Sequence, residues 1–392
     1  MRISRADRSL IAEWWFTVDR VLLTAVLVLA GTGLVLSLAA SPAVAIKKGF
    51  APFHFVERHL AFTVLGLALM LVVSLLQPRM IRRLALIVFL GSIAVMIAVL
   101  IGGEEINGAR RWLRIAGFSL QPSELAKPCF IVLAAWAFAE AQKQVDMPAR
   151  ALACALYAMF AIPLIFQPDV GQTLLISTVW GTLFVLSGQP LVWAAVLAGL
   201  GTVGLGVAYL SLGYVQARVD SFFSPGADET SQTARALQSF VEGGFLGRGP
   251  GEGTIKTALP DAHTDFIFAV VAEEYGAIAC LALVALIAFI VLRAYFRTFG
   301  ESDPFTRLAV AGLTVMFAMQ AAINMAVNVG LMPAKGMTLP FISAGGSSLL
   351  SVCLLMGMLL ALTRRRADAV RLRRPQLPLT NDHLGQLGST TQ

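Results

Sequence analysis

The sequence contains about ten long apolar runs, and these constrain its fold more than any other feature. A bilayer core is about 30 Å thick, and a helix needs roughly 20 apolar residues to cross it. Only 14% of the residues are charged, against about 25% in an ordinary soluble domain. We therefore predict an all-α polytopic membrane protein with about ten transmembrane helices. The runs lie near residues 21–41, 60–76, 84–101, 124–140, 151–166, 172–187, 191–212, 266–292, 308–330 and 339–362.

The basic residues indicate how the chain is oriented. The net charge of +7 does not predict nucleic-acid binding, because most Lys and Arg residues flank the apolar runs, where charge sets topology. An even number of spans places both termini on one side. With that side in the cytoplasm, the short cytoplasmic segments hold most of the basic residues, including Arg364–Arg366. We predict a multi-pass protein of the inner (cytoplasmic) membrane with both termini in the cytoplasm.

The chain divides around one membrane domain. We expect residues 1–20 to be a cytoplasmic N-terminal tail, residues 21–362 the ten-helix domain, and residues 363–392 a disordered cytoplasmic C-terminal tail. A large extracytoplasmic loop, residues 213–265, joins the seventh and eighth helices, and loops of that length are usually functional or disordered. Its glycine-rich stretch 247–253 lacks the Gly-Lys-Ser/Thr ending of a nucleotide loop, so we interpret it as a flexible loop.

The densest group of ionisable residues lies where this outer loop enters the eighth helix. Asp265 stands at the helix start near the outer surface, with His263 beside it. An acid at this position either caps the helix or serves as a general base on a substrate in the lipid interface. Glu273 and Glu274 lie about two turns further in, where ionisable side chains face a cavity or a partner. Pairing with a cation on another helix explains them as well as catalysis does.

Three arginines in the first long outer segment run against the positive-inside trend. Arg110, Arg111 and Arg114 need an anionic partner, and a lipid headgroup or pyrophosphate fits the fork of a guanidinium. Trp112 between them has the character of an interfacial anchor.

Further polar residues interrupt the apolar runs. Glu124 and Lys127 are spaced to pair on the next helix, and Asp169 is placed to cap the sixth. Two prolines, three glycines and three serines in residues 333–348, Ser347 among them, predict a broken helix. Such backbone survives in a membrane only when it is buried in protein or lines a cavity. Lys335 adds a cation near the outer mouth.

Taken together, these motifs resemble those of the SEDS family of shape, elongation, division and sporulation proteins. The resemblance covers roughly residues 20–365, and the details of residues 334–340 and of the Arg-Arg-Trp stretch favour the division branch. Two positions depart from the family pattern, since Ala344 replaces a usual aromatic and Glu242 a usual small residue. The matching stretches are NGARRWLRIAGFSLQPSELAK (107–127), QPDVGQT (167–173), GGFLGRGPGEG (243–253), LPDAHTDFIFAVVAEEYG (259–276) and GLMPAKGMTLPFISAGGSSLL (330–350).

The resemblance implies a peptidoglycan glycosyltransferase that polymerises lipid II on the outer face of the membrane at the division septum. It also implies a class B penicillin-binding protein as the transpeptidase partner, together with other divisome proteins. Asp265 becomes the essential carboxylate. No cofactor is certain, although a divalent cation would suit the departing pyrophosphate. The candidates for binding the pyrophosphate or headgroup are Arg110, Arg111, Trp112, Arg114, His263, Lys335 and Ser347.

Two other functions are open to such a chain. It could be a flippase that moves lipid II between leaflets, or a non-catalytic scaffold that recruits the transpeptidase. The concentration of polar motifs on the outer side favours the enzyme, because a flippase needs comparable polar groups on the cytoplasmic side, where the loops are short and basic.

Overall fold

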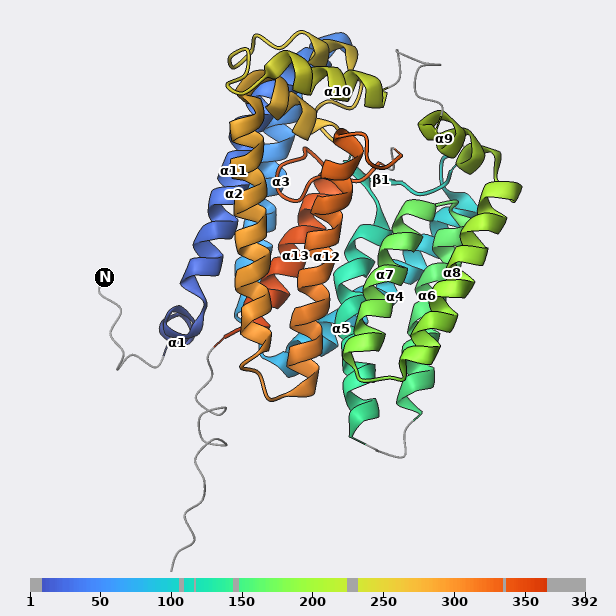
Figure 1. The fold of residues 1–392 in the computed structure, drawn as a ribbon. Coiled ribbons are helices and arrows are strands. Elements are labelled where there is room, and N and C mark those ends of the chain that lie inside the picture. The colour runs from blue at the N-terminus through green and yellow to red at the C-terminus, as the bar shows by residue number, and fades with distance from the viewer. Residues whose placement is uncertain are drawn as a thin grey trace, which may run out of the picture.

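Each predicted apolar run forms a helix in the computed structural model of the protein (Figure 1). The structure describes residues 9–105, 109–115, 118–143, 148–223, 232–333 and 336–364. A small antiparallel pair of strands, β1 (Leu113–Ile115) and β2 (Phe118–Leu120), precedes the fifth helix. The helices are α1 (Leu10–Thr17), α2 (Arg20–Lys47), α3 (His54–Ser74), α4 (Pro78–Gly102), α5 (Pro122–Gln142), α6 (Ala149–Phe166), α7 (Val170–Leu186), α8 (Leu191–Ser211), α9 (Gly213–Phe223), α10 (Gln232–Gly243), the 3-10 helix η1 (Ile255–Ala258), α11 (Ile267–Thr298), α12 (Pro304–Asn328) and α13 (Gly346–Leu362).

Seven of the described helices are long and apolar enough to cross a membrane by length and composition, namely α2, α3, α4, α6, α8, α11 and α12. Helices α7 and α13 are shorter and apolar. The prediction of an all-α polytopic membrane protein is therefore confirmed. The number of ten crossings stays a prediction, as does the division of the chain into tails and membrane domain.

Helix α5 lies inside the bundle, and α8 lies at its edge (Figure 1). α5 packs against α4, α6, α7, α12 and α13, and most of its residues are buried. α8 contains no buried residue, so its whole surface is suited to lipid. A polar residue on α5 is therefore enclosed by protein, whereas the periphery carries almost only apolar side chains.

Glycines allow close helix contacts around the core. A Cβ placed at Gly66 of α3 would lie 2.6 Å from Sγ of Cys353 on α13. A Cβ at Gly357 of α13 would lie 2.8 Å from the carbonyl oxygen of Met70 on α3. Small residues let helix backbones approach in this way in membranes, where packing rather than water exclusion joins helices.

The glycine-rich stretch 247–253 is a fixed element, so its interpretation as a flexible loop is wrong. Helix α11 is interrupted at Gly276, whose φ of +79° is left-handed, and the backbone of the loop docks into that break. Ala277 N–H donates to the Gly244 carbonyl at 2.9 Å, and Arg248 N–H donates to the Glu273 carbonyl at 2.9 Å. The break exposes polar backbone groups of α11, and the loop supplies their partners.

The broken helix predicted over residues 333–348 is present, and it moves the start of the last helix. Helix α13 begins at Gly346 rather than near residue 339. Residues 340–343 form turns instead, with Phe341 in a left-handed conformation at φ 64°. The turn is buried between helices, as irregular backbone at this depth requires.

Candidate active site

Asp265 is held at the end of a turn that leads directly into α11. Its main-chain carbonyl accepts a hydrogen bond from Nδ2 of Asn324 and another from Nδ2 of Asn328, each at 2.9 Å. Both amides project from α12, and Asn328 Oδ1 also accepts from Ala269 N–H at 3.0 Å. The backbone of Asp265 is thus clamped to α12, and Asn328 also ties the first turn of α11 to the same helix.

The turn after α12 fixes the same segment from the other side. Ser343 Oγ donates to the Thr264 carbonyl at 2.5 Å, and Ala344 N–H donates to the His263 carbonyl at 2.9 Å. Asn324 Nδ2 completes the frame by donating to the Met337 carbonyl at 2.6 Å. Two loops far apart in the sequence therefore define the position of Asp265 together.

The carboxyl group of Asp265 lies near Gly336. The N-cap of α11 is Phe266, without a side-chain cap hydrogen bond, so the interpretation of Asp265 as the N-cap residue is not supported. A Cβ built on Gly336 would lie 3.6 Å from Oδ2 of Asp265, which places the carboxyl beside this glycine. Asp265 is half-buried.

Glu273 and Glu274 both have structural partners, but only Glu274 pairs with a cation, as the pairing interpretation expected. The Glu273 carboxylate accepts from three successive backbone N–H groups, Thr254 at 2.6 Å, Ile255 at 2.7 Å and Lys256 at 3.0 Å. Glu274 forms an ion pair with Lys256 Nζ and accepts from Gly251 N–H at 3.0 Å. The cation comes from η1 in the loop between α10 and α11, and the two acids anchor that loop to α11.

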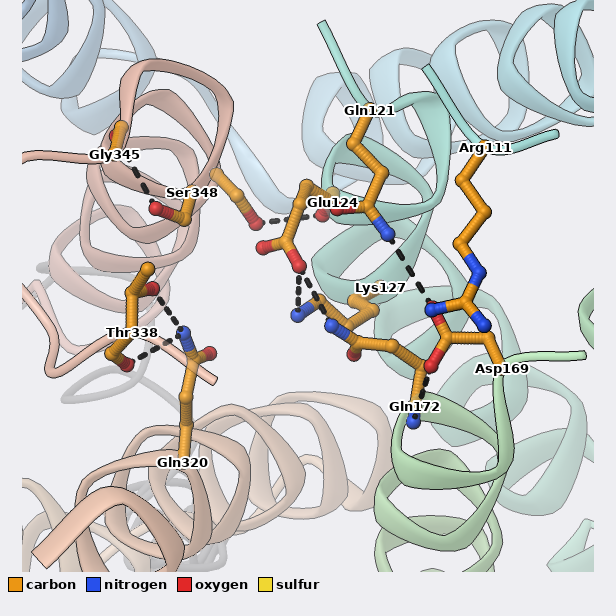
Figure 2. Close-up of polar contacts among 11 residues, drawn as sticks. Arg111, Gln121, Glu124, Lys127, Asp169, Gln172, Gln320, Thr338, Gly345 and Ser348 are labelled. Atoms are coloured by element: carbon orange, nitrogen blue, oxygen red, sulfur yellow. Dashed lines mark hydrogen bonds and ion pairs between the residues drawn. The ribbon is translucent and has the colours of Figure 1, made fainter. Parts of the chain in front are cut away.

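Arg111 joins the segment before β1 to the turn between α6 and α7 (Figure 2). Its Nε donates to the Gln167 carbonyl at 2.7 Å, and its guanidinium lies 3.5 Å from Oδ2 of Asp169. Asp169 caps α7 as predicted, since its side chain accepts from Gln172 N–H. Arg111 therefore positions this turn.

Arg110 and Arg114 form exposed ion pairs. Arg110 lies 3.7 Å from Glu105, and Arg114 lies 2.9 Å from Glu104. The sequence predicted anionic partners for the three arginines, and in the structure these partners are carboxylates of the same chain. Exposed pairs of this kind contribute only about 0–1 kcal/mol, so these two guanidiniums can exchange partners. Trp112 between them is half-buried.

Glu124 is the centre of a buried polar network on α5 and α7 (Figure 2). Its Oε1 accepts from Lys127 Nζ and from Gln172 Nε2, each at 2.8 Å. The predicted Glu124–Lys127 pair is therefore confirmed. Oε2 of Glu124 and Oε1 of Gln172 are buried without a hydrogen-bond partner among the described residues. Unpaired buried oxygens are costly, and they mark this network as a place where water or a ligand group would be stabilised.

Residues 336–351 connect this network with Asp265. Gly336 lies beside the Asp265 carboxyl, and the Thr338 carbonyl accepts from Gln320 Nε2 at 3.4 Å. Further along, Ser351 Oγ donates to the main-chain carbonyl of Glu124 at 2.6 Å. In Figure 2, Gln320, Thr338 and Ser348 lie across from Lys127 and Gln172, with Glu124 between the two groups.

Two predicted binding residues are enclosed instead. His263 is 5% exposed, its ring lies 4.5 Å from that of Phe55, and its Nδ1 has no hydrogen-bond partner among the described residues. Burial, and then the charge of Lys48, lower the pKa of His263 to about 4, so the ring is neutral and packs inside the protein. Ser347 is also buried. Their role as substrate ligands stays a prediction, and Lys335 lies outside the described residues.

The described residues contain no group of three or more His, Cys, Asp or Glu side chains that could hold a metal ion. Mg²⁺ usually needs only one or two protein carboxylates when substrate phosphates and water supply its other ligands. A divalent cation at the diphosphate therefore stays a prediction, and we derive no step through one.

Comparison with known proteins decides the family. A family model described as "Cell cycle protein", named for FtsW, RodA and SpoVE, matches residues 20–368. The chain belongs to the FtsW/RodA/SpoVE family. Among its relatives, a probable peptidoglycan glycosyltransferase FtsW of Caulobacter vibrioides is 48% identical over 93% of this chain and 94% of its own length. Another of the same name, from Trichlorobacter lovleyi, is 35% identical over 87% of this chain and 92% of its own.

Solved structures of peptidoglycan synthesis proteins have a similar fold. A peptidoglycan synthase complex described by its coordination of polymerization and crosslinking matches with a TM-score of 0.72 and 28% identity, over 88% of this chain and 97% of that chain. The crystal structure of Thermus thermophilus RodA matches with a TM-score of 0.66 and 26% identity, over 89% of this chain and 97% of that chain.

Sequence reasoning missed several residues of the site. Asn324 and Asn328 clamp Asp265, and Gln172 completes the network of Glu124. A signal existed, because polar amides inside an apolar span are expensive unless they have a partner. Asn324 and Asn328 are four residues apart, the spacing of one helix face, but the sequence alone does not say what that face meets.

Proposed function

We propose that this protein is a peptidoglycan glycosyltransferase that polymerises lipid II into glycan strands during septal wall synthesis. The names of its FtsW relatives support the activity. The observation that carries it on this chain is the clamped, half-buried Asp265 at the entry to α11.

The reaction that Asp265 suits is glycosyl transfer from a lipid diphosphate. The acceptor sugar hydroxyl gives its proton to the Asp265 carboxylate, and its oxygen forms a bond to the anomeric carbon of the donor. The bond between that carbon and the diphosphate oxygen breaks, and the diphosphate leaves with the electron pair. Because the diphosphate is a good leaving group, a base and local positive charge are the main needs of the site.

Arg110 and Arg114 are the candidates for receiving the diphosphate. Their exposed ion pairs with Glu105 and Glu104 cost little to exchange for phosphate oxygens, and guanidiniums bind phosphate in a fork. Trp112 would anchor this segment at the lipid interface, and Lys335 remains a candidate from the sequence. Arg111 instead positions the α6–α7 turn, because carbonyls and Asp169 already hold its donors.

The proposed setting is the inner membrane at the division septum. Both termini lie in the cytoplasm in this proposal, supported by the basic residues around α1 and after α13. The end of the bundle that carries α10 and Asp265 then faces outward. A class B penicillin-binding protein is the proposed partner, in keeping with the polymerization and crosslinking named for the related complex, and further divisome proteins would join it.

The test is polymerisation of labelled lipid II by the purified protein with its transpeptidase partner. Wild type and Asp265→Glu should form glycan strands, whereas Asp265→Ala and Asp265→Asn should form almost none while binding the partner normally. Normal polymer from Asp265→Ala would remove this carboxylate from the mechanism.

A flippase is the second candidate, because the Glu124 network places unpaired polar oxygens inside the bundle. This function predicts lipid II translocation in vesicles that contain this protein alone. Glu124→Gln should abolish the translocation, and Asp265→Ala should leave it unchanged.

A non-catalytic scaffold is the remaining alternative. It predicts normal cell division in cells that carry Asp265→Ala.

A further inference from the structure

Helix α10 and the loop after it expose several large apolar side chains. Val241 is 81% exposed, Phe245 79% and Leu246 80%. Single exposed apolar residues are ordinary, but a group of this size marks an interaction surface. We call Leu237, Val241, Phe245, Leu246 and Leu331 the apolar rim.

The side chains of α10 divide into three faces. Ala236, Ser239 and Gly243 are buried against the bundle. Leu237 and Val241, four residues apart, share an exposed apolar face. Gln238 and Glu242, also four apart, share an exposed polar face. A helix between protein and water needs only a buried face and a polar face. The additional exposed apolar face of α10 is typical of a helix that lies in a lipid interface, with its apolar face in lipid and its polar face in water.

The apolar rim continues the lipid-facing surface of the bundle. The Phe245 carbonyl accepts from Ile278 N–H of α11 at 3.3 Å, and Ile278 and Leu281 are themselves exposed on that spanning helix. At the other end, a Cβ at Gly330 would lie 3.0 Å from Cδ1 of Leu237, next to exposed Leu331. The rim therefore adjoins exposed apolar residues of α11 at one end and the segment after α12 at the other.

Several backbone groups beneath the rim are paired within the protein, as lipid contact requires. Gly249 N–H donates to the Glu274 carbonyl at 3.0 Å, and Gly247 N–H donates to the Gly243 carbonyl at 2.8 Å. Gly276 forms the break in α11 that receives this loop. Irregular backbone can lie at membrane depth only when its polar groups are paired in this way.

We propose that the apolar rim inserts into the lipid leaflet at the Asp265 end of the bundle. The rim side chains contact lipid at the boundary between headgroups and acyl chains, while Gln238 and the Glu242–Arg248 ion pair face the aqueous side. The same loop is anchored by Glu273 and Glu274. Insertion of the rim therefore sets the depth of the Asp265 turn relative to the lipid headgroups.

The test is a depth measurement with spin labels in lipid nanodiscs. Labels are placed at Phe245→Cys and Leu246→Cys, with Gln238→Cys as the matched control on the polar face of the same element. All three are made in a Cys154→Ser background, because the other three cysteines are buried. Collisions with oxygen, which partitions into lipid, are compared with collisions with a water-soluble nickel chelate.

The proposal predicts a ratio of oxygen to nickel collisions several-fold higher at positions 245 and 246 than at position 238. Equal ratios at the three positions would overturn it. The measurement is repeated with the transpeptidase partner added in excess. Unchanged ratios support lipid as the occupant, whereas loss of collisions with both reagents at 245 and 246 would identify the rim as a protein-docking face and overturn the proposal.

Discussion

Two groups of carboxylates lie close together in the chain and play different parts. Glu273 and Glu274 are buried, and loop N–H groups and Lys256 surround their oxygens. At Asp265, Asn324 and Asn328 hold the main-chain carbonyl, and the carboxyl is turned towards Gly336. An acid whose oxygens are consumed by backbone donors builds the fold. For Asp265, whose backbone is held by α12 and whose carboxyl lies near Gly336, we propose a role in the chemistry instead.

The largest expected effect is on catalysis at Asp265. Asp265→Asn keeps the size of the side chain and the backbone clamp but removes the base, so polymerisation should slow by about 10²–10⁴-fold. The midpoint of thermal unfolding in detergent should stay close to that of wild type. Glu252→Gln, an exposed acid of the same outer loop, is the control and should keep its rate. A strongly lowered midpoint in Asp265→Asn would make this acid structural as well.

Glu273→Ala should have the opposite profile. Three backbone N–H groups lose their acceptor, and each buried donor left unsatisfied costs about 1–3 kcal/mol. Thermal unfolding measures the loss, and limited trypsin digestion should cut after Arg248 and Lys256 once the loop is released. Glu273→Gln, which keeps one acceptor oxygen, should lie between the two. If Glu273→Ala were as stable as wild type, Glu273 would not be a structural acid, and its proposed difference from Asp265 would be wrong.

Asn324→Ala tests the clamp itself. The Asp265 and Met337 carbonyls each lose a hydrogen-bond donor. The Asp265 carboxylate is still present in this variant, but its position should change. Small misplacements cost up to about 100-fold in rate, and we expect a loss of about 10–100-fold in turnover with lipid II binding retained. Thr314→Ala, a buried polar residue on the same helix, provides the control. Equal losses in both variants would mean that α12 as a whole, rather than this amide, matters.

The smallest effect is a pH dependence from His263. Burial lowers its pKa to about 4 from an ordinary value of 6.5, so the unfolded chain binds a proton that the folded protein does not. Stability is constant above about pH 7 and falls as the pH drops through 6.5 towards 4, by about 1 kcal/mol at pH 5.5. His263→Phe should reduce this dependence, measured as the unfolding midpoint against pH. An unchanged profile would assign the dependence to other groups.

The helices were predictable because lipid makes a strong demand on sequence. Every spanning segment must be apolar and helical, so the apolar runs located α2 to α8 and α11 to α13, although several helix ends differ from the predicted ones by six or seven residues. The start of α13 was displaced because Leu339 to Ile342 are apolar yet lie in a turn. Helices α9 and α10 were not predicted, since they are short and carry mixed faces rather than an apolar run.

The site was predictable one residue at a time but not in its connections. Asp265, the Glu124–Lys127 pair and the cap at Asp169 could be expected from local spacing. The glycine-rich loop was misread because its partners, Glu273 and Glu274, lie on a helix further along the chain. Burial of His263 against Phe55 likewise depends on a helix from the start of the chain, and no local pattern encodes such a contact.

The central claim is that a carboxylate at position 265 is the group that drives polymerisation. It is tested most directly by chemical rescue of Asp265→Cys in the Cys154→Ser background, assayed for glycan strands from labelled lipid II with the partner present. Alkylation with iodoacetate restores a carboxylate, and alkylation with iodoacetamide adds a neutral group of similar size. We predict an inactive thiol form, partial recovery with iodoacetate and none with iodoacetamide. Wild-type polymerisation by the thiol form, or equal recovery with both reagents, would contradict the account.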